Sequence, residues 1–319
     1  MKFAVALLIT AFATLTVWGQ APTLHIVTEI PGLPSDLYYG NIKVKPLRLR
    51  PGTNTPITIN DADFFVNQQY TDFLSRFPDQ SGFDFWTNQI TSCAGNQVCI
   101  DGQRDNTSGA FFLSTEFQET GYLAERMYKV AYGDASGAST LGGNHNLSVP
   151  VIRRSEFLPD QLQLSNGVII GQPGALAQLE ANKVAYANDF VARARFTTAY
   201  PVGMSNATFV DTLNTNSGNA LDSGQRNSFV NQLNASTMTR AQVVRQVAED
   251  SDLNSAEKNK AFVLMQYLGY LRRDPNSGQD TDYTGYEFWL QKLNQHGGDF
   301  HAAQMVRSFI VSGEYLNRF

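Results

Sequence analysis

The sequence predicts an all-α protein, built from repeated helical units that follow a short extended leader. Apolar residues recur with the 3.6-residue period of a helix over much of the chain, and one motif returns about 200 residues later. Six of the twelve prolines fall within 22–60, where proline disfavours helices. With 319 residues, 42% of them hydrophobic, the chain is long enough to bury a core.

The N-terminus has the parts of a secretory signal peptide. Lys2 precedes an uncharged apolar run over 3–17, and small residues follow up to Ala21. The run is shorter than the ~20 residues that span a bilayer. We therefore expect residues 1–20 to be removed by cleavage near Gly19 or Ala21. The mature chain would have no transmembrane segment and would be secreted, periplasmic or at the cell surface.

Residues 21–60 are predicted to form an extended, Pro-rich leader. Short β-branched runs such as 42–45 favour one or two short strands within it. The leader ends near Asn60, where the helical pattern begins.

Composition narrows the possible functions. Charged residues make up only 17% of the chain, against roughly 25% in typical soluble domains, and 24 Asn and 21 Gln take their place. The net charge of -5 leaves no basic excess for a nucleic-acid backbone. The only two cysteines, Cys93 and Cys99, are too few for a zinc framework, and we expect them to form a structural disulfide. We expect no cofactor.

The first predicted helix starts after Asn60 or Asp61, either of which is a suitable N-cap. Its apolar face consists of Val66, Tyr70, Phe73, Leu74 and Phe77. The same face returns 197 residues later, beginning at Val263. This regular offset indicates an internal repeat.

A polar motif follows each of these helices. Its members are Arg76, Pro78, Asp79, Ser81, Gly82, Asp84 and Trp86 in one copy, and Arg273, Pro275, Thr284, Gly285, Glu287 and Trp289 in the other. A hydroxyl followed three residues later by a carboxylate predicts a capping box that starts a second helix. We expect each tryptophan to pack against the first helix of its unit. Each arginine is expected to bond carbonyl groups or to pair with an acid of its unit, with anion binding as the alternative.

A third helix closes the unit in both clear copies. Residues 111–117 parallel 309–315, and each segment contains Ser-x-Glu-aromatic. Residues 242–245 parallel 304–307, which indicates a degenerate copy without the tryptophan in the middle of the chain. The predicted organisation is a first unit over 61–132, loop and packing helices over 133–200, and the degenerate and second units over 201–319. Within it, 133–149 is expected to be a loop, and 176–196 a helix.

The combined motif, Arg-x-Pro-Asp, Gly, aromatic-Trp and a closing Ser-x-Glu-aromatic, resembles the family known as domain of unknown function 4214. The resemblance covers most of the chain beyond Asp61. It implies a helical fold similar to that of phycobilisome linker domains and an exported bacterial protein. The family has no established catalytic residues, so the resemblance implies no active site.

One segment was considered as a weak calcium site. It contains the oxygen-bearing residues Asp274, Asn276, Asp280 and Asp282, but Gly285 stands where an EF-hand loop requires glutamate. We therefore expect a solvated turn and no metal.

The predicted function is non-enzymatic: protein interaction or assembly in the cell envelope or outside the cell, with an unknown protein or surface polymer as partner. An alternative is glycan binding through Tyr283 and Tyr286. A glycan-cleaving hydrolase using paired carboxylates such as Glu116, Glu119 and Glu156 is a further alternative.

Overall fold

The computed structural model describes residues 23–33, 35–45 and 48–319, which form two units divided between Pro46 and Leu47. The first unit contains a three-stranded antiparallel sheet of β1 (Leu24–Val27), β2 (Asp36–Tyr39) and β3 (Ile42–Val44). The leader is thus extended as predicted, with one strand more than expected. The predicted signal peptide lies outside the described residues. No helix in the described ranges is long and apolar enough to cross a membrane.

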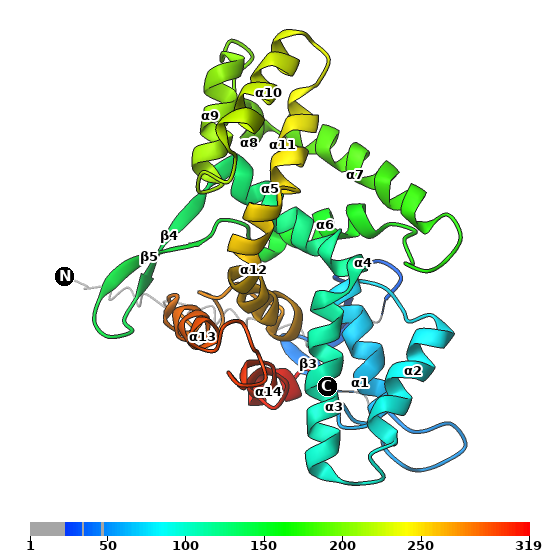
Figure 1. The fold of residues 1–319 in the computed structure, drawn as a ribbon. Coiled ribbons are helices and arrows are strands. Elements are labelled where there is room, and N and C mark those ends of the chain that lie inside the picture. Colours follow the sequence, from blue (N-terminus) through cyan, green and yellow to red (C-terminus); the bar gives the residue numbers. More distant parts are fainter. Residues whose placement is uncertain (1–22, 34, 46–47) are drawn as a thin grey trace, which may run out of the picture. The chain divides into compact units, whose positions relative to one another are not determined.

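The second unit is mainly helical and begins with a first copy of the repeat (Figure 1). Its helices are α1 (Ala62–Gln69), the π-helical turn η1 (Tyr70–Leu74), α2 (Gln80–Thr91), α3 (Gln97–Leu113) and α4 (Thr115–Gln118). Helix α1 starts after Asp61 as predicted, but the Asp61 carboxylate accepts from the backbone N–H of Thr58 and pairs with Arg50. The predicted apolar face is buried except for Phe77, which is 49% exposed because the helix has already ended at Leu74.

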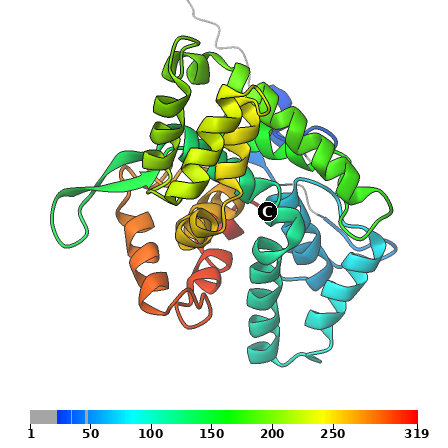
Figure 2. The ribbon, with the colours of Figure 1, turned by 45° about the horizontal axis from the view of Figure 1, so that its top comes forward.

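Further helices and a hairpin connect the first copy to the rest of the unit. They are α5 (Gly121–Tyr132), β4 (Asp134–Ser139), β5 (His145–Pro150), α6 (Arg154–Ser165), α7 (Ala175–Ala192) and α8 (Ala194–Ala199). The expected loop over 133–149 is wrong, because β4 and β5 pair as an antiparallel hairpin that extends away from the helices (Figure 2). Together with the leader sheet, this hairpin makes the chain mostly helical rather than all-α. Helix α7 confirms the helix expected over 176–196.

Two more copies complete the chain. The middle copy comprises α9 (Asn206–Asn216), α10 (Ser223–Asn234) and α11 (Arg240–Ala248). The last copy comprises α12 (Ser251–Met265), η2 (Gln266–Leu271), α13 (Thr284–Gln295), α14 (Met305–Ile310) and α15 (Gly313–Leu316). Buried residues from all three copies belong to one continuous hydrophobic core.

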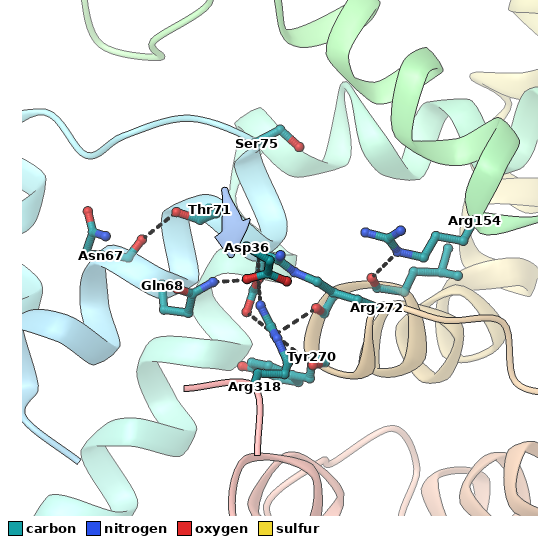
Figure 3. Close-up of polar contacts among 12 residues, drawn as sticks. Asp36, Asn67, Gln68, Thr71, Ser75, Arg154, Tyr270, Arg272 and Arg318 are labelled. Atoms are coloured by element: carbon teal, nitrogen blue, oxygen red, sulfur yellow. Dashed lines mark hydrogen bonds and ion pairs between the residues drawn. The ribbon is translucent and has the colours of Figure 1, made fainter. Parts of the chain in front are cut away.

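The first and last copies pack directly against each other at their π-helical turns. Gly269 of η2 lies against η1, and a Cβ at this position would be 3.3 Å from the Asp72 carbonyl oxygen. The Asp72 side chain is fully buried and accepts from Gln68 and Arg318, with Arg272 3.3 Å away. Figure 3 labels the three donors, Gln68, Arg272 and Arg318, around this contact. A buried carboxylate with several donors therefore ties the two copies together.

Candidate functional site

The polar motif adopts the same local geometry in the first and last copies. Each π-helical turn ends at a residue in the left-handed region, Ser75 with φ 54° and Arg272 with φ 51°. The next residue is the motif arginine, and its backbone N–H bonds the carbonyl of Tyr70 or Tyr267 six residues earlier. The widened turn thereby stops the helix and directs the arginine back across it.

Each motif arginine forms a bidentate ion pair with the glutamate at the end of its own copy. Arg76 donates to Glu116 at 2.6 and 2.9 Å, and Arg273 donates to Glu314 at 2.6 and 3.0 Å. Burial lowers the pKa of Arg76, but the hydrogen bonds and the negative charge of Glu116, with smaller contributions from Tyr70 and Asp79, together outweigh burial and leave the pKa raised. The expectation that each arginine pairs with an acid of its unit is confirmed.

A tyrosine and a glycine complete this arrangement. The guanidinium groups of Arg76 and Arg273 lie 4.9 and 5.3 Å from the ring centroids of Tyr70 and Tyr267. A Cβ on Gly82 would collide with the Tyr70 hydroxyl oxygen, and in the last copy a Cβ on Gly285 would lie 2.7 Å from the hydroxyl oxygen of Tyr267. The motif glycine is therefore required by the close approach of the tyrosine, a contact that the sequence did not reveal.

The predicted capping boxes are wrong in both copies. Helix α2 starts two residues earlier than expected, so Asp79 is its N-cap and accepts from the Gly82 N–H at 2.9 Å. Ser81 then lies inside the helix and donates to Asp79, while Asp84 accepts from Gln80. Pro78 precedes this cap.

In the last copy, the two side chains that were predicted to cap the helix contact the β4–β5 hairpin instead. The Thr284 hydroxyl accepts from the Thr140 N–H at 2.8 Å, and the Glu287 carboxylate lies 3.0 Å from the imidazole of His145. The Tyr283 N–H also donates to the carbonyl of Ala138. Thr284 and Glu287 therefore hold the hairpin against α13 instead of capping the helix.

Each motif tryptophan packs against an aromatic residue of the third helix of its copy, a contact that the sequence did not predict. Trp86 lies 6.0 Å from Phe111 of α3, and Trp289 lies 5.6 Å from Phe309 of α14, between ring centroids. The residue before each tryptophan is a phenylalanine that faces solvent: Phe85 is 53% exposed and Phe288 is 44% exposed.

A groove of about 380 Å³ lies along this surface in the first copy. It runs between α2 and α3, and Tyr70, Arg76, Asp79, Phe85, Trp86 and Glu116 contribute to its walls. The backbone hydrogen bonds to Asp79 lower the pKa of its carboxyl group, which is therefore ionised at neutral pH. The groove thus combines exposed aromatic rings with two carboxylates and one arginine.

Tyr283 and Tyr286 cannot form the exposed aromatic platform considered for glycan binding. Tyr283 is 4% exposed beneath the hairpin, and Tyr286 is fully buried. The hairpin strand approaches Tyr283 so closely that only glycine fits at Gly137. This correction removes the residues on which the glycan alternative rested.

The four calcium candidates each have another partner. Asp274 accepts from the Arg154 N–H, Asn276 from Arg153, Asp280 from Arg273, and Asp282 from the Thr284 N–H. Pro275 lies within this segment, directly after Asp274, and is buried. Within the described ranges, no three His, Cys, Asp or Glu side chains lie close enough together to hold a metal ion.

The carboxylates considered for hydrolysis are also separately paired. Glu116 pairs with Arg76, Glu119 with Lys183, and Glu156 with Arg195. Cys93 and Cys99 form a disulfide as predicted, with Cα atoms 5.6 Å apart.

Comparison with known families supports the repeat. The family model of DUF4214, described as a domain of unknown function, matches residues 58–121 and 187–254. The predicted resemblance is therefore confirmed, although the second matched segment covers the middle copy, which we had regarded as degenerate. The last copy lies outside the matched segments despite sharing the ion pair and tryptophan of the first. No curated protein and no solved structure matches the chain.

Proposed function

We propose that this chain, two segments of which match the DUF4214 family, is an exported, non-enzymatic protein that binds a partner protein through its repeated helical copies. The observation that carries the proposal is an exposed phenylalanine stacked edge-on against a partly buried tryptophan, Phe85 with Trp86 on α2 and Phe288 with Trp289 on α13. Large aromatic side chains that remain half exposed at equivalent positions in two copies are typical of binding surfaces.

Export is supported by two independent features of the chain. The N-terminal sequence has the pattern of a cleavable signal peptide. The Cys93–Cys99 disulfide is of a kind that persists in oxidising compartments. N-terminal sequencing of protein from the secreted and envelope fractions tests this part of the proposal. A mature chain that starts near residue 20 is expected, and an intact Met1 in a cytosolic fraction would contradict export.

A non-enzymatic role is supported by the pairing of the acids that hydrolysis would use. Glu116, Glu119 and Glu156 each pair with a different Arg or Lys. Their presence is therefore explained by ion pairs that stabilise the fold. The proposal predicts that purified protein releases no reducing sugar from wall polysaccharide. Release that disappears in a Glu116→Gln variant would overturn it.

The binding surface is tested by capture of partners from envelope and secreted fractions. A double variant, Phe85→Ser with Phe288→Ser, is expected to lose the captured partner. The matched control is Val202→Ser, which removes a side chain that is 97% exposed outside these surfaces. Identical capture by the wild type and the double variant, with circular dichroism showing both folded, would refute the proposed surface.

A further inference from the structure

The first and last copies differ in the cations that accompany the Phe-Trp pair. In the last copy, the Lys292 ammonium lies 5.8 Å from the Phe288 ring centroid and 5.2 Å from that of Trp289. Lys292 is one helical turn beyond Phe288, so helix α13 supplies a cation–π partner from its own sequence. The equivalent residue of the first copy, at the same offset of 203, is Gln89. Phe85 and Trp86 therefore have no such cation on their own helix.

The acid beside the aromatic pair shows the same difference. Glu287 of the last copy is held by His145 of the hairpin. Its equivalent, Asp84, is exposed, and its carboxylate accepts a hydrogen bond from the neutral amide of Gln80 at 2.8 Å. Asp84 forms no ion pair within the described part of the chain. The first copy thus lacks both the lysine of the last copy and the histidine contact that the hairpin provides there.

Charge favours a cationic ligand at the first copy. Residues 61–121 contain nine Asp and Glu but only two Lys and Arg. Six of these acids pair with Arg or Lys from other parts of the chain, and two face Arg76, so among the nine only Asp84 has no ion pair within the described residues. Asp79 contributes to the groove beside Phe85 and Trp86, and its carboxylate lies 3.6 Å from its nearest arginine, Arg76. A positively charged group in this groove could therefore meet both an aromatic face and a carboxylate.

We propose that the Phe85–Trp86 groove of the first copy binds a lysine or arginine side chain from a basic segment of a partner protein, in the role that Lys292 fills at Phe288–Trp289. This inference rests on the proposed function, because it assumes that the exposed Phe-Trp pairs bind a protein. It adds that the partner presents a cationic side chain and that the first copy is the copy that binds it. The last copy already carries its own cation and is not expected to bind the same ligand strongly.

The experiment titrates the purified protein with a capped tetralysine peptide and follows the indole N–H signals of Trp86 and Trp289 by NMR. A Trp86→Phe variant assigns the signals. We expect saturable shifts at Trp86 that weaken with salt, and much smaller shifts at Trp289. Tetralysine with acetylated side chains, which has the same backbone without the charge, is expected to produce no saturable shift.

Exchanging the residue types at the equivalent positions Gln89 and Lys292 provides the decisive comparison. Gln89→Lys supplies the missing cation within α2 and is expected to weaken tetralysine binding at Trp86 at least fivefold. Lys292→Gln removes the cation of the last copy and is expected to create a second binding site at Trp289. Asn231→Lys on α10 adds the same charge far from α2 and should change the affinity less than twofold (Figure 1).

Three outcomes would overturn the inference: no tetralysine binding, equal binding of the acetylated peptide, or undiminished binding by Gln89→Lys. The proposed function is tested separately by partner capture. If Phe85→Ser with Phe288→Ser abolishes capture while tetralysine fails to bind, only the cationic chemistry is wrong. If capture is also unaffected by the two serines, the proposed surface itself fails.

Discussion

Phe73 and Tyr270 occupy equivalent positions in the first and last copies, and their rings meet edge to face with centroids 5.1 Å apart. Each ring also contacts the aromatic residue that closes its own copy, Phe117 for Phe73 and Tyr315 for Tyr270. The Tyr270 hydroxyl donates to Gln69 of the first copy at 2.7 Å. The same position of the repeat therefore has two packing roles: its ring packs within its own copy, and it also packs against the other copy.

Phe73→Ala is expected to lower the free energy of unfolding by about 4 kcal/mol, because it opens a cavity where two copies meet. Phe73 is 1% exposed, so its surroundings cannot hydrate the gap readily. Urea denaturation provides the measurement. Phe77→Ala, at a residue that is 49% exposed, is the control and should cost less than about 1 kcal/mol. Equal losses in the two variants would contradict the interpretation of the joint.

Glu116→Gln is expected to destabilise the protein more than Glu314→Gln. The Glu116 side chain is 5% exposed, and the next acid that Arg76 meets is Asp79 at 3.6 Å. Glu314 is 23% exposed, and Arg273 retains Asp280 at 2.7 Å. We predict losses of about 3 kcal/mol for Glu116→Gln and about 1 kcal/mol for Glu314→Gln in thermal or urea unfolding. A larger loss for Glu314→Gln than for Glu116→Gln would show that burial does not determine how much these two ion pairs stabilise the protein.

The contact between His145 and Glu287 is expected to weaken as pH rises. The hydrogen bond to the Gly143 carbonyl and the contact with Glu287 raise the pKa of His145 above 6.5. The stabilisation is therefore complete below that value and is lost as pH rises through the raised pKa. NMR titration of the His145 ring should show the raised pKa in the wild type and a lower one in Glu287→Gln. An unchanged titration in this variant would exclude Glu287 as a cause.

Glu125→Gln is expected to reduce the dependence of stability on pH. Glu125 is 2% exposed, and its Oε2 atom has no hydrogen-bond partner in the described part of the chain. Burial, followed by the nearby Glu257, raises the pKa of Glu125 well above 4.5. The folded protein then holds a proton that the unfolded chain releases, so stability falls as pH rises above the unfolded value.

The measurement for Glu125→Gln is urea unfolding at about pH 5 and about pH 8. The wild type should lose stability between the two conditions, and the variant should lose less. Glu29→Gln provides a comparison at a residue that is exposed to solvent. If the free energy of unfolding of Glu125→Gln depends on pH as strongly as that of the wild type, another group binds the proton.

The sequence was sufficient to predict the repeat, because the helical period and the spacing of Arg, Gly and Trp are local properties. The same holds for the disulfide, whose cysteines are six residues apart. Carbonyl bonding or pairing with an acid was predicted for Arg76 and Arg273 because both recur beside a proline, and the structure contains both kinds of contact.

Features that depend on distant segments were not predictable in this way. Thr284 and Glu287 have the spacing of a capping box, but a hairpin more than 130 residues earlier in the chain takes both side chains. The same hairpin buries Tyr283, which the local sequence suggested could be exposed. Asp79, two residues before Ser81, is the actual N-cap of α2, although the local sequence favoured Ser81. Local patterns thus identified the elements, while tertiary contacts decided which polar groups remained available.

The joint between the first and last copies also constrains how the chain can fold during synthesis. Phe73 leaves the ribosome 197 residues before Tyr270, and Asp72 leaves it 246 residues before Arg318, the partners that cover them. At typical elongation rates of roughly 5–20 residues per second, this interval lasts on the order of ten seconds or more. Such long-range contacts slow folding and leave apolar surface open meanwhile. The apolar surface around Phe73 therefore stays uncovered until the last copy emerges.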